Sequence, residues 1–458
     1  MRHKLSLIVL ALTFATVIAA PPLETKPNDP CFAKFDPVKA PAPAGLLLKP
    51  GDRLAICGDS ITEQKMYSRI METYLTVCVP ELHVTVRQYG WSGERAPGFL
   101  ARMTNDCLRF SPTIATTCYG MNDHEYRPYE ERIGKTYCEK TTAIVQSFKQ
   151  AGARVVLGSP GCVGKMPHWV KTASGTVEDL NLSLCKLRNM DIEIAAKERV
   201  AFADVFWPMF TAGFEARQKY APNYAIAGKD GVHPGWAGQL VMAYAYLKAM
   251  GLDGSIGTFT VDLAKGKASA TAGHKVVSSK AGEITIESRR YPFCATGDEK
   301  SDGSVRSAMT LIPFNQNLNR LTLVAKNARA KSYKVTWGAG TRTYSAEQLA
   351  RGVNLAADFA ENPFSDAFKK VEDAVLAKQS YETKQVKQIF NDLMKGKFKT
   401  AADIKDPEIK ELFAMRDAAG KLDREAIVKA TEAKRAPLAA AIKAAFAPVT
   451  HTIKIAAE

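Results

Sequence analysis

The chain has 458 residues, of which 46% are hydrophobic and 24% are charged. This balance is typical of a folded globular protein and excludes a disordered, collagen-like or multi-spanning membrane chain. The length exceeds the roughly 250 to 300 residues at which one hydrophobic core stops growing, so we expect at least two domains. Lysine and arginine outnumber aspartate and glutamate by 62 to 47, and the formal net charge of +15 suits an anionic partner.

Residues 1–20 have the pattern of a secretory signal peptide. Arg2 and Lys4 precede an apolar run from Leu5 to Ala20, and this run is short for a membrane span of about 20 residues. An uncleaved anchor is the alternative. We therefore expect an exported protein, periplasmic or secreted, with no transmembrane helix after signal removal. Export argues against nucleic acid as a partner and favours an anionic envelope or polymer surface.

Residues 21–44 are rich in Pro, Ala and Lys without a periodic apolar pattern, which predicts an extended leader. Residues 45–252 alternate between short apolar runs and amphipathic stretches. Strands are predicted at Arg53 to Cys57, His83 to Gln88, Thr113 to Cys118, Arg154 to Gly158 and Val200 to Val205. Helices are predicted at Gln64 to Val77, Tyr129 to Ala151, Leu180 to Lys197 and Ala237 to Met250. Strands separated by helices predict a parallel sheet covered on both faces, with function at the carboxyl ends of its strands.

Residues 255–458 have a different texture and form a second, β-rich region in this prediction. Period-two runs at Gly282 to Ser288, Arg320 to Ala325 and Tyr333 to Gly338 predict a small antiparallel β domain. From about residue 345 to 447 the pattern is helical, with Pro407 and Pro437 expected to separate helices. Thr450 to Ile455 alternates like a strand, so we expect a helical insertion whose last strand returns to the β domain.

The nine cysteines all lie beyond residue 20, and their odd number leaves at least one thiol unpaired. Export permits disulfides, but the spacing does not assign their pairing. There is no CxxC pair and no Cys/His cluster with zinc spacing, so we predict no metal site. Cys57 and Cys118 lie in apolar, strand-like runs, where they are expected to be small buried hydrophobes.

The first candidate site residue is Ser60, in a Gly-Asp-Ser turn that follows the apolar run ending at Cys57. A serine hydroxyl is a weak nucleophile unless a base removes its proton and a third group orients that base. The alternative interpretation is a helix cap, a role that serine often has.

A base and its orienting group occur together far downstream, in the Asp230-Gly231-Val232-His233 tract before the last predicted helix of the domain. Asp and His three residues apart on one loop can face each other, so that the carboxylate fixes the imidazole tautomer and the other nitrogen serves the serine. The pairing of Asp230 and His233 with Ser60 favours catalysis over a structural histidine.

Acyl transfer also needs donors aimed at the developing oxyanion. Gly93 follows the second predicted strand and offers a backbone N–H, while Asn122 follows the third and offers a side-chain amide. Each has a structural alternative, a turn for the glycine and a helix cap for the asparagine. Their position after successive strands is what favours a shared role.

The set Ser60, Gly93, Asn122 and His233 resembles the SGNH hydrolase superfamily, also called GDSL-type esterases, in residue type and order. The resemblance implies a flavodoxin-like three-layer α/β/α domain over residues 45–252. It implies Ser60 as nucleophile, His233 as base supported by Asp230, and an oxyanion hole formed by the Ser60 N–H, Gly93 and Asn122. It requires no metal and no organic cofactor. The tract reads Gly-Asp-Ser-Ile-Thr without the family's leucine, a variation that leaves the nucleophile assignment intact.

The function expected from this resemblance is that of a secreted serine esterase that deacetylates acetylated carbohydrate. Trp91, Tyr119, Tyr126, Trp169 and Trp236 lie in or near the motif loops, where their rings could stack on sugars or simply pack. A lipase or lysophospholipase and an O-acyltransferase are the alternatives. A further alternative is a non-catalytic protein that binds polysaccharide or the cell envelope. It is supported by the excess of positive charge between Thr258 and Ser345, where 14 Lys and Arg face 6 Asp and Glu. The sequence does not determine the oligomeric state.

Overall fold

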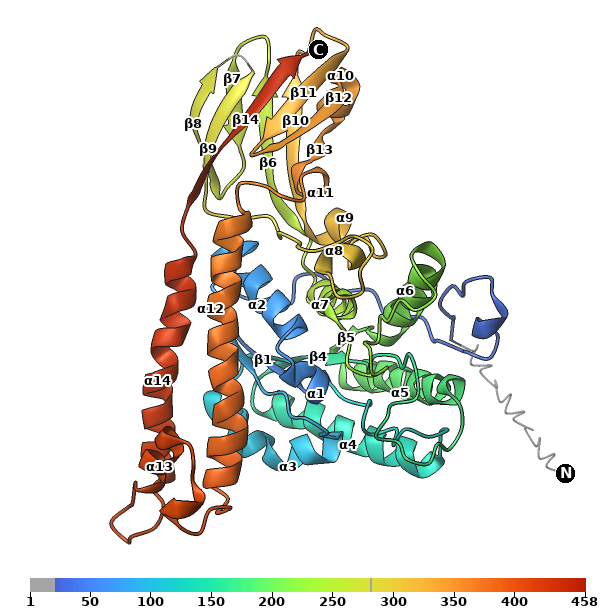
Figure 1. Cartoon of the computed structure of the whole chain (residues 1–458), viewed down its shortest axis with the longest axis vertical. Coiled ribbons are helices and arrows are strands. Elements are labelled where there is room, and N and C mark those ends of the chain that lie inside the picture. Colours follow the sequence, from blue (N-terminus) through green and yellow to red (C-terminus); the bar gives the residue numbers. More distant parts are fainter. Residues whose placement is uncertain (1–20, 281) are drawn as a thin grey trace, which may run out of the picture.

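The computed structural model describes residues 21–280 and 282–458, so the predicted signal peptide at residues 1–20 lies outside the described residues. Figure 1 shows an α/β domain, a pair of β-sheets above it and an arm of long helices along its side. Among the described residues, no helix is both long and apolar enough to cross a membrane.

The α/β domain is built on a parallel five-stranded sheet of order β2-β1-β3-β4-β5. Its strands are β1 (Arg53–Gly58), β2 (Thr85–Gln88), β3 (Ile114–Cys118), β4 (Arg154–Gly158) and β5 (Ala201–Ala203). Its helices are α1 (Ser60–Glu63), α2 (Tyr67–Val77), α3 (Ala96–Asp106), α4 (Glu131–Gln150), α5 (Val177–Glu198), α6 (Phe206–Lys219) and α7 (Trp236–Ala249), with short turns η1 (Pro30–Phe32), η2 (Pro80–Leu82) and η3 (Leu108–Phe110). The strand order is flavodoxin-like, which confirms the predicted fold class.

Successive residues of β1 pack on opposite faces of this sheet, as the period of a strand requires. Leu54 and Ile56 join a core with α2 and α7, whereas Ala55 and Cys57 join a second core with α3 and α4. Because helices cover both faces of the sheet, a site can form at the carboxyl ends of its strands. Helices α3 and α6 were not predicted from the sequence.

The leader is more ordered than its composition suggested. Phe32 and Phe35 are each 1% exposed, and the Phe32 ring packs edge-on against Trp207 and Phe214 of the α6 helix. Leu23 and Val38 form an isolated antiparallel bridge. Two buried aromatic side chains, which form no periodic pattern, therefore help to dock this segment, and hydrogen bonds from Arg188 and Asn189 to its backbone carbonyls add to them.

The β domain contains a four-stranded sheet of order β13-β10-β6-β7 and a five-stranded sheet of order β12-β11-β14-β9-β8. Its strands are β6 (Ser255–Asp262), β7 (Lys267–Ala270), β8 (His274–Lys280), β9 (Glu283–Ser288), β10 (Arg320–Lys326), β11 (Ser332–Trp337), β12 (Gly340–Ser345), β13 (Val353–Asn354) and β14 (Val449–Ala457). Its short helices are α8 (Val305–Ala308), α9 (Phe314–Leu318), α10 (Ala346–Arg351) and α11 (Leu355–Asp358).

The prediction of an antiparallel β domain was wrong for one strand pair, because β6 and β10 run parallel. Parallel strands need a long connection. Here the chain passes through three further strands and then leaves the sheets at residues 289–319, where α8 and α9 pack on α7 of the α/β domain. This excursion also brings the carbonyl of Asp302 within 3.1 Å of the Ala237 amide, which donates to it.

We call residues 365–445 the helical arm. It consists of α12 (Ser365–Lys384), the π-helical η4 (Gln385–Leu393), the short turn η5 (Ala401–Asp403), α13 (Pro407–Phe413) and α14 (Arg424–Ala445). The arm is narrower than the predicted span of 345 to 447, because α10 and α11 pack on β10 and belong to the β domain. After the arm, β14 pairs with β9 and β11, so the expected return of the last strand is confirmed.

Pro437 does not separate two helices but lies inside α14, so that prediction was wrong. Proline removes one backbone donor, which leaves the carbonyl four residues earlier, on Ala433, without its helical partner. Pro437 and Ala433 are both exposed, so water can hydrogen-bond that carbonyl. Pro407, in contrast, occupies the first turn of α13, where a missing N–H costs nothing.

All nine cysteines lie in the described part of the chain and carry free thiols there. Cys57 and Cys118 are 0% and 3% exposed, which confirms that they act as buried hydrophobes.

Candidate active site

Ser60 begins α1 directly after β1, at the carboxyl end of the central part of the sheet. The buried carboxylate of Asp59 caps this helix by accepting the Ile61 N–H at 2.9 Å. Burial raises the pKa of Asp59 to about 7, although the hydrogen bond from Ile61 acts in the opposite direction. The tight turn therefore fixes the backbone of Ser60, and the residue as a whole is half-exposed.

The loop before α7 brings His233 to this hydroxyl. His233 Nε2 lies 2.7 Å from Ser60 Oγ, and His233 Nδ1 lies 2.7 Å from Asp230 Oδ2. The other Asp230 oxygen accepts the backbone N–H groups of Val232 and His233, each at 2.9 Å. The sequence placed these three side chains in one site, and the structure brings them into a continuous hydrogen-bonded row.

The Asp230 carboxylate is held in its charged form. Partial burial would raise its pKa, but the hydrogen bonds from the two amides and from the His233 ring outweigh burial and keep the pKa below its ordinary value. A carboxylate that stays ionised can hold the proton on Nδ1, which leaves Nε2 free to accept a proton from the serine. The row can thus move a proton away from Ser60 Oγ.

Gly93 lies in the loop between β2 and α3, residues 89–95, which we call the Gly93 loop. The loop crosses the end of α1 so closely that a Cβ on Gly90 would lie 2.2 Å from the Glu63 nitrogen, which only glycine allows. Gly93 itself has a φ of 73° and open space around it. Within the described chain, its N–H donates to no other group, so it is free to bind a substrate oxygen.

Asn122 follows β3 and is fixed at both ends of its amide. Its Nδ2 donates to the Glu94 carbonyl at 3.1 Å, and its Oδ1 accepts the Tyr126 hydroxyl at 3.0 Å. The second N–H of Nδ2 remains for a ligand. The neighbouring Asp123 joins the two loops because it accepts the amides of Ala96 and Gly120, each at 2.9 Å.

Beneath the Gly93 loop lies a buried ion cluster that the sequence did not reveal. Arg102 forms a two-pronged contact with the Glu94 carboxylate, both bonds measuring 2.6 Å, and also lies 3.2 Å from Asp106. Tyr119 donates its hydroxyl to the same Glu94 carboxylate at 2.9 Å. These residues are separated along the chain, and single charges in a helical pattern give no signal that they meet.

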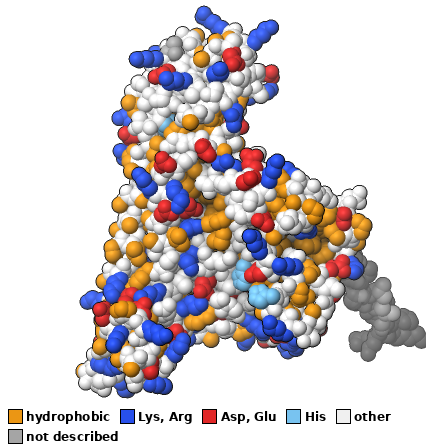
Figure 2. Space-filling view, in the orientation of Figure 1, with side chains coloured by type: hydrophobic (Ala, Val, Ile, Leu, Met, Phe, Trp, Pro, Cys, Tyr) orange, Lys and Arg blue, Asp and Glu red, His pale blue; other side chains and the backbone are white. Residues whose placement is uncertain are grey.

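Of the five aromatic residues noted in the sequence, two line the site near His233. The Trp169 ring lies 5.7 Å from the His233 ring, and Tyr126 packs edge-on against Trp169 at 5.8 Å. Tyr119 is buried, and the other two tryptophans stack with arginine side chains. Figure 2 shows histidine side chains gathered on the surface of the α/β domain.

A pocket of about 380 Å³ lies beside His233. Gln64, Lys229 and Asp230 belong to the α/β domain, while Asp302 and Gly303 come from the excursion of the β domain. Both domains therefore shape the space beside the histidine. In the described part of the chain, no group of three or more His, Cys, Asp or Glu side chains is arranged to hold a metal ion.

Comparison with known proteins identifies the domain that carries this site. The model of the GDSL-like lipase/acylhydrolase family matches residues 56–241, a span that includes Ser60, Gly93, Asn122, Asp230 and His233. The α/β domain belongs to the GDSL-like lipase/acylhydrolase family. Residues 56–241 therefore carry the domain of a GDSL-type, or SGNH, carboxylic ester hydrolase.

Solved structures resemble this GDSL-type chain at low identity. A gut microbial diltiazem-metabolizing enzyme is 20% identical, with a TM-score of 0.68 over 91% of this chain and 100% of that chain. An acetylxylan esterase from Geobacillus stearothermophilus is 20% identical, with a TM-score of 0.37 over 45% of this chain and 97% of that chain. The first likeness shows that the fold recurs over most of the chain. No curated protein matches the chain.

Proposed function

We propose that this GDSL-type hydrolase is an exported serine esterase that removes acetyl groups from carbohydrate. The observation that carries the proposal is the row of hydrogen bonds from Ser60 Oγ through the His233 ring to the Asp230 carboxylate. A hydroxyl next to a correctly oriented imidazole is the arrangement that acyl transfer to serine requires.

In the proposed reaction, His233 Nε2 takes the Ser60 proton as Oγ attacks the ester carbonyl carbon. The tetrahedral oxyanion is bound by the N–H groups of Ser60 and Gly93 and by the free Nδ2 hydrogen of Asn122. The C–O bond then breaks, His233 returns the proton to the departing alcohol, and an acyl-enzyme remains. Water then attacks the acyl carbon while His233 takes one of its protons. The bond between this carbon and Ser60 Oγ breaks, and His233 returns the proton to Oγ as the acid leaves.

The surroundings of His233 support a polar alcohol as leaving group. The alcohol departs on the His233 side because the imidazolium protonates it, and the pocket there is lined by Gln64, Lys229 and Asp302. Such groups can hydrogen-bond hydroxyls, and the half-buried Trp169 ring offers a face on which a sugar can stack. These groups suit an alcohol that carries several hydroxyl groups.

The test compares the mature protein with Ser60→Ala on p-nitrophenyl acetate, longer p-nitrophenyl esters and acetylated polysaccharides. We expect the wild type to release acetate from the polymers and to prefer the acetyl ester, and Ser60→Ala to lose at least about 10³-fold in kcat while remaining folded. A preference for long acyl chains would contradict the carbohydrate substrate. Full activity in Ser60→Ala would overturn the mechanism.

A further inference from the structure

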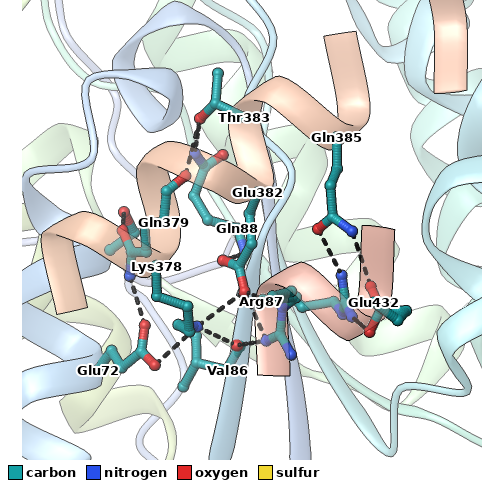
Figure 3. A network of polar contacts seen from close by, with 12 residues as sticks. Glu72, Val86, Arg87, Gln88, Lys378, Gln379, Glu382, Thr383, Gln385 and Glu432 are labelled. Carbon is teal, nitrogen blue, oxygen red and sulfur yellow. Dashed lines mark hydrogen bonds and ion pairs between the residues drawn. The ribbon is translucent and has the colours of Figure 1, made fainter. Parts of the chain in front are cut away.

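The helical arm covers the edge of the sheet that leads into the Gly93 loop. Strand β2 is an edge strand, and its Val86 carbonyl accepts hydrogen bonds from Lys378 Nζ at 2.5 Å and from Arg435 Nη2 at 3.1 Å. At the end of the strand, the Gln88 N–H donates to Glu382 at 3.1 Å (Figure 3). The arm therefore supplies side-chain hydrogen bonds to the edge of the strand from which the loop starts.

A second connection reaches the middle of the loop through α1. Lys387 Nζ lies 2.8 and 3.0 Å from the two carboxylate oxygens of Glu63, three residues after Ser60. The same carboxylate accepts the Ser92 N–H at 2.5 Å. Lys387 also lies 5.6 Å from the centre of the Trp91 ring. One lysine of the arm thus fixes the residue that directly precedes Gly93.

A third connection reaches the far end of the loop. Asn391 Nδ2 donates to Asp106 at 2.8 Å, and Asp106 contacts Arg102, which grips the Glu94 carboxylate. The carbonyl of the same Glu94 accepts the hydrogen bond that orients Asn122. Both sides of Gly93, and the Asn122 amide, are therefore linked to the arm by hydrogen bonds.

Lys387 and Asn391 belong to the same nine-residue π-helical segment, Gln385–Leu393. A π-helix is rare and is frequently found at functional sites. Its wider turn leaves backbone groups to be satisfied, and Asn391 Nδ2 also donates to the Val386 carbonyl at 2.8 Å. The unusual turn thus lies where the arm meets the active-site loops.

We propose that the helical arm holds the oxyanion hole in its working geometry, with Lys387 as the main positioning residue. This inference rests on the proposed function, in which Gly93 and Asn122 bind the oxyanion. Donors stabilise a transition state only when they are already aimed at it, and a misplacement of about 1 Å can cost about 10²-fold in rate. Lys387 touches no reacting atom and acts through Glu63 and Ser92.

The test measures p-nitrophenyl acetate hydrolysis by full-length Lys387→Met, Lys387→Arg and the control Lys395→Met. Lys395 lies exposed on the same arm. We expect Lys387→Met to lower kcat by about 10-fold or more with KM within about twofold, because ground-state binding does not use the oxyanion donors. Lys387→Arg should recover most of kcat, and Lys395→Met should match the wild type.

A double-mutant cycle separates positioning from a loss of folding. Glu63→Gln should lower kcat as Lys387→Met does, and the double variant should lose no more than the larger single loss, because both changes break one connection. Reaction of Ser60 with a p-nitrophenyl phosphonate, which also places charge in the oxyanion hole, should slow in parallel. Thermal unfolding midpoints near that of the wild type would show that the variants are folded.

Wild-type kcat in Lys387→Met, or additive losses in the cycle, would overturn the positioning role. The same applies if kcat falls only in proportion to the fraction of folded protein. Failure of the proposed function gives a different result, since the wild type would then show no Ser60-dependent hydrolysis at all.

Discussion

At the scale of single residues, the site contains two carboxyl groups, those of Asp230 and Asp59, whose surroundings shift their pKa values in opposite directions. Asp230 is held ionised by hydrogen bonds, whereas Asp59, next to the nucleophile, is 2% exposed and has its pKa raised to about 7 by burial. Near neutral pH the two carboxyls therefore have different tendencies to hold a proton. Only Asp230 is suited to stabilise an imidazolium in the proposed mechanism.

The raised pKa of Asp59 predicts a stability change with pH. The unfolded chain ionises this carboxyl near its ordinary pKa of 3.8, whereas the folded chain retains the proton up to about 7. The folded state then binds more protons over this window, so the contribution of Asp59 to the free energy of unfolding falls as pH rises from about 4 to 7. Above about pH 7 Asp59 is ionised in both states, and its contribution to the free energy of unfolding no longer changes with pH.

Asp59→Asn removes this titration but keeps an oxygen that can accept the Ile61 N–H. From 1.36 kcal/mol per pKa unit, we expect the variant to gain up to about 4 kcal/mol over the wild type between pH 4 and pH 8. Urea unfolding of both proteins across this range measures the difference. Asp366→Asn, at an exposed position, is the control. A difference that does not vary with pH would contradict the assigned burial effect.

At the scale of elements, α12 is joined to the α/β domain by a buried network of ions (Figure 3). Lys378 is 1% exposed and lies 2.9 Å from Glu72 and 3.0 Å from Glu382. Arg435 of α14 contacts the same Glu382 at 2.6 Å. Such a network is a fixed attachment point, because each charge has lost its water and depends on its partners.

Lys378→Met leaves the two carboxylates buried with fewer partners. We expect the free energy of unfolding to fall by about 3 to 5 kcal/mol, the range found when one member of a buried ion pair is removed. Chemical denaturation of Lys378→Met measures this loss. Lys395→Met is the control, because it makes the same lysine-to-methionine change at an exposed position. A loss below about 1 kcal/mol would show that the network does not bear on stability.

At the scale of the whole molecule, three parts of the chain converge on one site. The α/β domain supplies the hydroxyl and the imidazole, the β domain supplies Asp302 beside His233, and the arm supplies Lys387 behind the Gly93 loop. The positive charge of the molecule adds a long-range attraction for anionic polymers, which dissolved salt screens over about 10 Å at 0.1 M.

This charge predicts a salt effect that depends on the substrate. Between 20 and 300 mM NaCl, we expect KM for an acetylated acidic polysaccharide such as acetylated pectin to rise by about threefold or more. KM for a neutral acetylated glucomannan and for p-nitrophenyl acetate should stay constant. Equal salt effects on the acidic and the neutral polymer would rule out electrostatic recruitment.

Much of the active-site set was accessible from sequence because it lies in short motifs after successive strands. Parallel strands bring their carboxyl ends to one edge of the sheet, so the sequence pattern alone places Ser60, Gly93 and Asn122 near each other. Their catalytic roles stay predictions. The position of Pro437 within α14 was not predicted, because it depends on solvent access to the carbonyl of Ala433. The parallel pairing of β6 with β10 was not predicted either, because it depends on the path of the chain between the two strands.

The sequence by itself determined the α/β repeat, the candidate nucleophile and base, and the return of the last strand, because hydrophobic period and local motifs carry this information. Only the tertiary structure decided that Lys387 contacts Glu63, 324 residues away, and that Asp302 borders the pocket of His233. In a helix with charges of both signs, most lysine side chains simply point into solvent, so the sequence does not show which lysine makes a buried contact. Its partner is set by how the arm packs on β2, which is a property of the whole fold.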